Sequence, residues 1–359
     1  MAATADTRRP GHLVIPRKAK QDDSSECGAS SPERSSPSCS PKLKVRNPTS
    51  KSREIAELVP PSVIGDFYDF GHVLGAGAFG TVKEILHSKT FETFAGKLLH
   101  KADVKSQERI VMETLLNCAH DSLLRYVHIF EDAEFFYIVM PKAVGGDVRG
   151  VCGLFGTEQY TVAWLTSVAG QLFDALHYLF GKCNLIHRDI KPENLLFLDE
   201  AQQSICIADF DMAVVAGSEG YVKCSGASGT AGYLAPECLR EFRYSSSSDI
   251  FAMAVAIVVV ISGESPCKGV SKLSSSETEK ECELMLTWIS RVRDSLTVAT
   301  QPFHGIPVEM AEVLSVCLSP TLEERPRSAR DVLRTGWLAG TTAGRSKKRA
   351  GSRRTVLSP

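Results

Sequence analysis

The sequence lacks the features of secreted, zinc-binding and membrane-spanning proteins. Its eleven cysteines are odd in number and scattered, without a C-x-x-C pair, so reduced thiols are expected rather than a disulfide framework or a zinc site. The first ten residues contain no apolar run, and we therefore expect no signal peptide. The longest apolar run, residues 251–261, is well short of the ~20 residues that a membrane span needs. We expect a soluble, intracellular protein without a membrane partner, in which this run is a buried helix.

An excess of charge of either sign is also missing. The chain carries 41 basic and 42 acidic residues, and such a balance provides no global field that would attract nucleic acid. A nucleic-acid partner is therefore not expected. With 359 residues, the chain has room for one large or two ordinary domains with a sizeable core.

Both ends of the chain are poor in large apolar residues. Residues 1–62 are rich in Ser, Pro and basic side chains, and such a segment cannot bury enough apolar surface to offset its ordering entropy. We expect a disordered tail, whose Ser-Pro pairs at Ser31, Ser36 and Ser40 are candidate phosphorylation sites or simply part of a flexible segment. Residues 339–359 form a basic tail, suited to a nuclear localisation signal, to an arm that faces nucleic acid or to a plain solvated end. The expected location is the cytoplasm, the nucleus or both.

The region between the tails has strand patterns first and helix patterns later. Hydrophobic spacing and turn residues place each element. The expected strands are 67–74, 83–86, 91–99, 123–130, 134–140, 195–198 and 205–208, and the expected helices are 105–120, 160–179, 282–293 and 308–318.

Residues 75–80 have three glycines in the spacing G-x-G-x-x-G. Glycines let backbone N–H groups approach a phosphate without obstruction by side chains. Dinucleotide-binding folds share this spacing, but in them a helix follows the last glycine. Here the residues after Gly80, T-V-K-E-I-L, have a strand pattern, which argues against a dinucleotide-binding oxidoreductase.

The most informative stretch is L-I-H-R-D-I-K-P-E-N-L-L-F-L, residues 185–198. Asp189 could accept a proton from a hydroxyl, and Lys191 could meet a transferring phosphoryl group. Asn194 offers an amide oxygen, a hard ligand suited to magnesium. A polar turn between a helix and a strand is the alternative interpretation.

This string resembles the catalytic loop of serine/threonine protein kinases, H-R-D-x-K-x-x-N, and looks most like that of the calcium/calmodulin-dependent type. Two further strings fit in order, D-F-D at 209–211 and A-P-E at 235–237. The resemblance covers residues 66–338 and implies an α+β, two-lobe protein-kinase fold. A small antiparallel sheet with one helix (66–140) would be joined by a hinge (141–144) to a mainly helical lobe (145–338). The cofactors implied are ATP and Mg²⁺.

The resemblance also assigns the nucleotide cleft. Lys97 in F-A-G-K would hold the α- and β-phosphates, with Gly96 in place of an aliphatic residue. Met140 would guard the back of the adenine pocket, and Asp147 would reach the ribose or a basic substrate residue. The glycine loop would cover ATP with Leu74, Gly75, Ala76, Gly77, Ala78, Phe79, Gly80, Thr81 and Val82.

An active kinase needs a helix glutamate that orients the lysine, and the segment 105–120 offers two. Glu113 lies at the more usual distance from Lys97. Glu108 shares its helical face with Val111 and Met112. The sequence leaves this choice open.

The D-F-D string departs from the family pattern. Asp209 matches the aspartate that binds magnesium, whereas Asp211 replaces a glycine. Glycine adopts backbone conformations that cost other residues energy, although Asp tolerates them better than most. We interpret Asp211 as a changed switch, with lost activity as the alternative.

The activation segment and two structural contacts are also assigned by resemblance. Ser225 and Ser228 are candidate activating phosphosites that Arg188 would pair with, or simply residues of a flexible loop. Thr230 would lie beside Asp189. The remaining matches are an ion pair between Glu237 and Arg325 and a hydrogen-bonding contact between Asp249 and the catalytic-loop backbone.

The function that these motifs imply is transfer of the γ-phosphoryl group of Mg–ATP to Ser or Thr hydroxyls of proteins. Glu193 and Asp147 suggest a preference for basic substrate motifs, and the serines of the activation segment suggest an upstream kinase. The alternative is a pseudokinase scaffold, favoured by Asp211, Gly96 and the unsettled glutamate. The presence of Lys97, Asp189, Asn194 and Asp209 argues against it.

Overall fold

The computed structural model describes residues 64–77, 80–266, 278–299 and 302–341, all of which belong to one unit, Glu54–Pro359. The expected tail 1–62, most of the basic tail, and Ala78 and Phe79 of the glycine loop lie outside the described residues.

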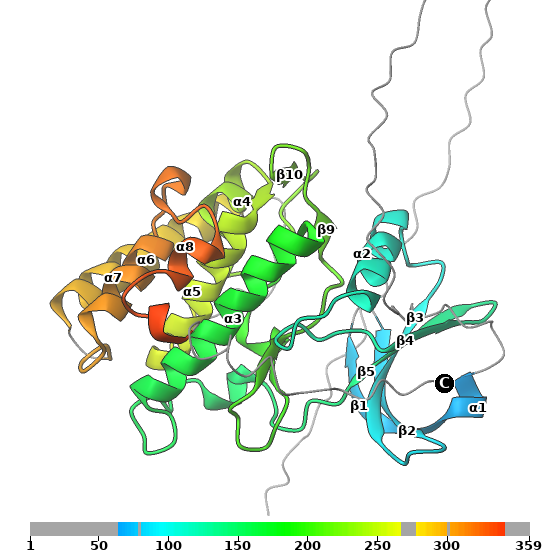
Figure 1. Cartoon of the computed structure of the whole chain (residues 1–359). Coiled ribbons are helices and arrows are strands. Elements are labelled where there is room, and N and C mark those ends of the chain that lie inside the picture. The colour runs from blue at the N-terminus through cyan, green and yellow to red at the C-terminus, as the bar shows by residue number, and fades with distance from the viewer. Residues whose placement is uncertain (1–63, 78–79, 267–277, 300–301, 342–359) are drawn as a thin grey trace, which may run out of the picture. The chain divides into compact units, whose positions relative to one another are not determined.

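The first part of the fold is an antiparallel sheet of five strands (Figure 1), preceded by the short helix α1 (Ile64–Phe67). Its order is β1-β2-β3-β5-β4. The expected strand after Gly80 is present as β2, which confirms that no helix follows the glycines. The strands are β1 (Tyr68–Gly77), β2 (Gly80–His87), β3 (Thr93–His100), β4 (His128–Glu131) and β5 (Phe135–Pro141).

Two groups of side chains cover this sheet. Tyr68, Ile85, Phe130 and Val139 form a small buried cluster of their own. The helix α2 (Ser106–Leu116) contributes Val111, Met112 and Leu115 to the main core. This burial matches the periodic spacing of those three residues in the sequence.

Gly80 is required for a structural reason. Its φ is +145°, and a Cβ atom there would lie 2.3 Å from the carbonyl oxygen of Leu98 on β3. Only glycine permits this approach of two backbones. The third glycine of the loop therefore fixes the spacing of β2 and β3.

The second part of the fold is mainly helical (Figure 1). Helix α5 (Ser246–Ser262) is its centre, because all residues from Ser246 to Ile261 are buried. The prediction of a buried helix over 251–261 is confirmed. Among the described residues, no helix has the length and apolar character to cross a membrane. The other helices are α3 (Val162–Cys183), α4 (Pro236–Arg240), α6 (Thr278–Val298), α7 (Val308–Cys317) and α8 (Ala329–Leu333).

Short strands and 3-10 turns frame the catalytic loop. Three antiparallel pairs form: β6 with β9, β7 with β8, and β10 with β11. Their bounds are β6 (Leu185–Ile186), β7 (Leu195–Phe197), β8 (Ile205–Ile207), β9 (Val214–Val215), β10 (Tyr221–Lys223) and β11 (Arg243–Ser245), and the turns are η1 (Val148–Val151), η2 (Pro192–Asn194) and η3 (Leu322–Glu324).

One expected strand is largely wrong. Of residues 123–130, only those from His128 onward form β4. The preceding residues instead contact β8, where the N–H of Leu124 donates to the Ile207 carbonyl at 2.8 Å and the Ile207 N–H donates to the Ser122 carbonyl at 3.0 Å. An apolar segment buried by such contacts has the same sequence pattern as a strand.

Candidate active site

The catalytic loop begins where α3 ends. Asn184 stops the helix in a left-handed conformation (φ 54°), and its side-chain amide donates to the Ala216 carbonyl at 3.0 Å. Strand β6 then carries the chain to His187 and Arg188. The Asp249 carboxylate of α5 accepts the N–H groups of His187 at 2.8 Å and Arg188 at 3.0 Å. Burial raises the pKa of Asp249 against the pull of these donors. The contact expected from Asp249 is present.

Asp189 lies at the centre of a compact group. Its Oδ2 accepts from Lys191 Nζ at 2.7 Å and from the Asn194 amide at 3.1 Å. The hydroxyl of Thr230 donates to the other carboxylate oxygen at 2.6 Å and also accepts from Lys191 Nζ at 2.8 Å. Asp189 is only 8% exposed. A threonine hydroxyl thus lies between a carboxylate and an ammonium group.

His187 is a residue of this site that the sequence analysis did not single out. It is fully buried, and its ring lies against the Phe210 ring with centroids 5.0 Å apart. Its Nε2 lies 3.0 Å from the carbonyl oxygen of Ala208. His187 therefore connects the catalytic loop to the D-F-D segment. Its place before Arg188 and Asp189 in the matched string was the available signal.

Lys97, on β3, reaches the D-F-D segment. Its Nζ donates to Asp211 at 2.6 Å and 2.5 Å, one bond to each carboxylate oxygen, and to Asp209 Oδ1 at 3.1 Å. The Lys97 and Asp211 side chains are only 12% and 13% exposed, whereas that of Asp209 is 41% exposed. Asp209 was expected at this site from its motif, whereas no contact was expected for Asp211.

The expected pairing of Lys97 with a helix glutamate needs correction. Glu108 accepts the N–H of Lys105 at 3.1 Å and so caps the start of α2. Glu113 faces Arg109 at 3.8 Å on the exposed surface of the helix. Within the part of the chain that the structure describes, the carboxylate partners of Lys97 are Asp209 and Asp211. The acidic group comes from the D-F-D segment rather than from α2.

The charges of Lys97, Asp209 and Asp211 shift one another's pKa values. Burial disfavours the charged form of Lys97, but Asp209 and Asp211 outweigh it and raise the pKa of Lys97. Burial and the charge of Asp209 raise the pKa of Asp211 to about 6. Desolvation also acts to raise the pKa of Asp209, but Lys97 outweighs it and lowers that pKa. The carboxylates titrate as a pair because one ammonium group cannot neutralise both.

The strain at this site lies at Asp209 rather than at Asp211. Asp209 has a φ of 59°, and Arg188 has a φ of 67°. Asp211 lies outside the left-handed region. The replacement of the motif glycine by Asp211 therefore places no side chain on a backbone that requires glycine.

The nucleotide-side predictions fall on described elements, apart from Ala78 and Phe79. Leu74, Gly75, Ala76 and Gly77 lie in β1, and Gly80, Thr81 and Val82 lie in β2. Met140 is buried near the end of β5. Asp147 caps η1 by accepting the N–H of Gly150 at 3.2 Å, so its carboxylate is already engaged.

The activation segment is held against the catalytic loop. Arg188 donates through Nε to the Met212 carbonyl at 2.6 Å and through Nη1 to Cys224 Sγ at 3.0 Å. The N–H of Ser228 donates to the Tyr244 hydroxyl at 2.6 Å. Ser225 follows Cys224 and is exposed. Arg188 is thus occupied by unmodified residues.

Glu237 and Arg325 form the ion pair that the resemblance implied. The Arg325 guanidinium donates to Glu237, and both side chains are buried. It also donates to the Ser247 carbonyl at 3.3 Å and lies over the Phe251 ring at 5.2 Å. Arg325 follows η3, and through these contacts it connects α4, which ends the activation segment, with α5.

Oxygen donors suited to magnesium come from two segments. Asp209 offers a carboxylate, and the Asn194 amide nitrogen is engaged by Asp189, so the amide oxygen of Asn194 is the end that can face a cation. The described residues contain no group of three or more His, Cys, Asp or Glu that could hold a metal alone. A pair of oxygen ligands fits magnesium, which usually completes its shell with phosphates and water.

Comparisons with known proteins identify the family of this chain. The family model for the protein kinase domain matches residues 68–338. Calcium/calmodulin-dependent protein kinase cmkA of Emericella nidulans is 33% identical over 203 residues, which is 55% of this chain and 48% of that protein. Serine/threonine-protein kinase DCLK2 of Homo sapiens is 31% identical over 217 residues, 59% of this chain and 27% of that protein.

Calcium/calmodulin-dependent protein kinase type 1 of Caenorhabditis briggsae is 30% identical over 225 residues, which is 61% of either chain. The chain thus spans about half the length of the Emericella relative and about a quarter of the DCLK2 relative. The family model covers the chain from β1 to the end of the helical part. The chain belongs to the protein kinase family, and its relatives are serine/threonine kinases of the calcium/calmodulin-dependent and DCLK types.

Proposed function

We propose that the protein transfers the γ-phosphoryl group of Mg–ATP to Ser or Thr hydroxyls of proteins. The observation that carries this proposal is the Thr230 hydroxyl, 2.6 Å from Asp189 and 2.8 Å from Lys191 Nζ. An acceptor hydroxyl would need the same two neighbours, because a general base must lie within hydrogen-bond reach of the proton that it takes.

Each residue then has one task. Asp189 orients the acceptor hydroxyl and takes its proton, and Lys191 stabilises the transferring group. Lys97 holds the α- and β-phosphates. Asp209 and Asn194 would hold magnesium, which supplies charge stabilisation to the phosphates. Catalysis of this kind depends mostly on positioning and on charge, so these few groups suffice.

The substrate and location remain part of the proposal. Glu193 lies 3.9 Å from Arg149 in a half-exposed pair, an arrangement in which a substrate arginine could replace Arg149. We therefore propose basic residues before the phosphosite, an upstream kinase acting on Ser225 or Ser228, and a cytoplasmic or nuclear location.

The second candidate is a nucleotide-binding pseudokinase scaffold. Its supporting observation is that Glu108 and Glu113 contact Lys105 and Arg109 rather than Lys97, since an active kinase is expected to use such a glutamate. The two candidates differ in transfer and agree in ATP binding.

The test is phosphate transfer from radiolabelled Mg–ATP to a basic Ser/Thr peptide, with wild type compared with Asp209→Asn. Asp294→Asn is the matched control, because Asp294 is an exposed residue of α6. We expect transfer by wild type and by the control, and a loss of roughly 10²-fold or more with Asp209→Asn. Wild-type protein that binds Mg–ATP without transfer would favour the scaffold.

A further inference from the structure

The polar contacts of Lys97 are unequal. Asp211 receives two hydrogen bonds of 2.6 Å and 2.5 Å, and Asp209 receives one of 3.1 Å. Lys97 and Asp211 are also the buried members of the group, at 12% and 13% exposure against 41% for Asp209. The tighter and better shielded partner is therefore the residue that stands in place of the motif glycine.

The backbone makes this possible. Asp211 lies outside the left-handed region, while Asp209 lies inside it with a φ of 59°. A side chain at position 211 therefore costs no backbone strain of the kind that favours glycine. The position is free to carry a functional group, and the group it carries is a carboxylate that points to Lys97.

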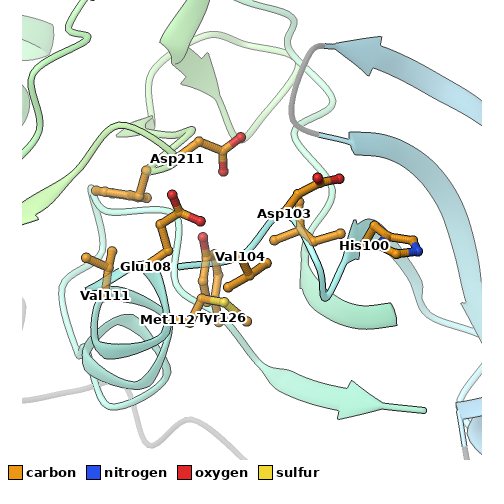
Figure 2. Close-up of a pocket in the computed structure, with 10 residues that line it drawn as sticks. His100, Asp103, Val104, Glu108, Val111, Met112, Tyr126 and Asp211 are labelled. Atoms are coloured by element: carbon orange, nitrogen blue, oxygen red, sulfur yellow. The ribbon is translucent and has the colours of Figure 1, made fainter. Parts of the chain in front are cut away.

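The helix glutamates do not compete for Lys97. Glu108 and Asp211 line the same cavity of about 60 Å³ between α2 and the D-F-D segment (Figure 2). Moving Glu108 to Lys97 would remove its bond to the Lys105 N–H. It would also bring a third carboxylate beside Asp209 and Asp211, and like charges at such distances repel. Asp211 thus provides the carboxylate contact to Lys97, and Glu108 is not needed for that contact.

A buried ammonium group needs a nearby negative charge, because burial without one strongly disfavours the charged form. We propose that Asp211 is the residue that positions Lys97 in the nucleotide cleft, in place of a helix glutamate. Asp211 acts through Lys97 and needs no contact with the reacting atoms. The kinetic part of this proposal rests on the proposed function, and the pairing itself does not.

The pairing is tested by a double-mutant cycle in urea unfolding of the full chain. Its variants are Lys97→Met, Asp211→Asn and the double substitution. The control cycle uses Lys97→Met, Glu108→Gln and their double substitution. We expect the effects of the first pair on the unfolding equilibrium to depart from additivity by about tenfold, as for residues in one ion pair. The control cycle should be additive. Additivity in the first cycle would overturn the proposal.

Positioning is tested by kcat and KM for ATP. Asp211→Asn keeps the shape of the side chain, and Asp211→Gly restores the motif glycine. Both should lower kcat/KM roughly tenfold to a hundredfold, mostly through kcat, because a misplaced lysine stabilises the transition state poorly. Glu108→Gln, which can still accept the Lys105 N–H, and the exposed Glu113→Gln should match wild type.

The outcomes separate the two proposals. A gain of activity with Asp211→Gly, wild-type kinetics with Asp211→Asn, or a large loss with Glu108→Gln would each contradict the positioning role. If wild type transfers no phosphate, the proposed function fails, and the unfolding cycle alone then decides whether Asp211 holds Lys97.

Discussion

Arg188 and Asp209 are non-glycine residues with φ values of 67° and 59°, and both belong to the cleft. Such conformations cost of order 1–3 kcal/mol and persist only where the surroundings enforce them. Asp249 holds Arg188 in this conformation, because its carboxylate accepts the N–H groups of both His187 and Arg188. The backbone conformation just before Asp189 is therefore supported by one buried side chain, that of Asp249.

Asp249→Asn tests this dependence. The amide can accept one N–H but turns its own NH₂ group toward the other, which leaves a buried donor unsatisfied at a cost of about 1–3 kcal/mol. We expect a lower Tm and a lower kcat, measured by thermal unfolding and peptide phosphorylation. Wild-type values of both quantities, with Asp294→Asn as the reference, would show that Asp249 does not hold the loop.

At the residue scale, short-range patterns were sufficient for part of the site. Asp189, Lys191 and Asn194 lie within six consecutive residues, so their proximity follows from the loop itself. The contact of Lys97 with Asp211 joins residues 114 positions apart. The sequence marked Asp211 as a departure from the motif, but spacing alone could not tell which carboxylate would reach a lysine on another strand.

At the element scale, Arg325, which follows η3, pairs with Glu237 of α4 and also contacts Ser247 and Phe251 of α5. One oxygen of Glu237 and the Nε of Arg325 are buried without a hydrogen-bond partner among the described residues. A buried pair is costly to break, because removal of one partner leaves the other charge uncompensated. The intact pair therefore adds little net stability but holds the end of the activation segment in place, and removal of one partner alone is costly.

We predict that Arg325→Met lowers the free energy of unfolding by about 3–5 kcal/mol, measured by urea denaturation. Adding Glu237→Leu to Arg325→Met should recover part of the loss, because the unpaired charge is then removed as well.

The exposed pair of Arg291 and Glu264, at 3.1 Å with side chains 65% and 52% exposed, provides the control. Arg291→Ala should change stability by about 1 kcal/mol or less. Equal losses for Arg291→Ala and Arg325→Met would contradict the role of burial.

Helices were easier to predict than strands at this scale. The apolar run at 251–261 and the periodic segment at 160–179 correspond to α5 and α3, because long repeats carry a strong signal. Residues 123–127 were expected to continue a strand, but Leu123 and Leu124 pair with Ile207 of β8 across the fold. That contact depends on tertiary packing, which a local pattern does not contain.

At the scale of the whole molecule, the proposed ATP site draws Lys97 from β3, Asn194 from η2 and Asp209 from the segment after β8. A ligand that binds only this folded arrangement stabilises it by about 2.7 kcal/mol at about a hundred times its dissociation constant. We expect Mg–ATP to raise Tm by several degrees, and Lys97→Met or removal of magnesium with EDTA to reduce the rise. An equal rise in Tm for wild type with Mg–ATP, for Lys97→Met with Mg–ATP and for wild type with ATP and EDTA would place ATP binding elsewhere.

The measurement that tests the central claim most directly is transfer of phosphate from Mg–ATP to a basic Ser/Thr peptide by wild type and by Asp209→Asn, with Asp294→Asn alongside. The account predicts transfer by wild type and Asp294→Asn, and roughly 10²-fold less or none by Asp209→Asn. Equal transfer by all three proteins would contradict the assignment of Asp209, and absence of transfer by wild type that still binds Mg–ATP would contradict kinase activity itself.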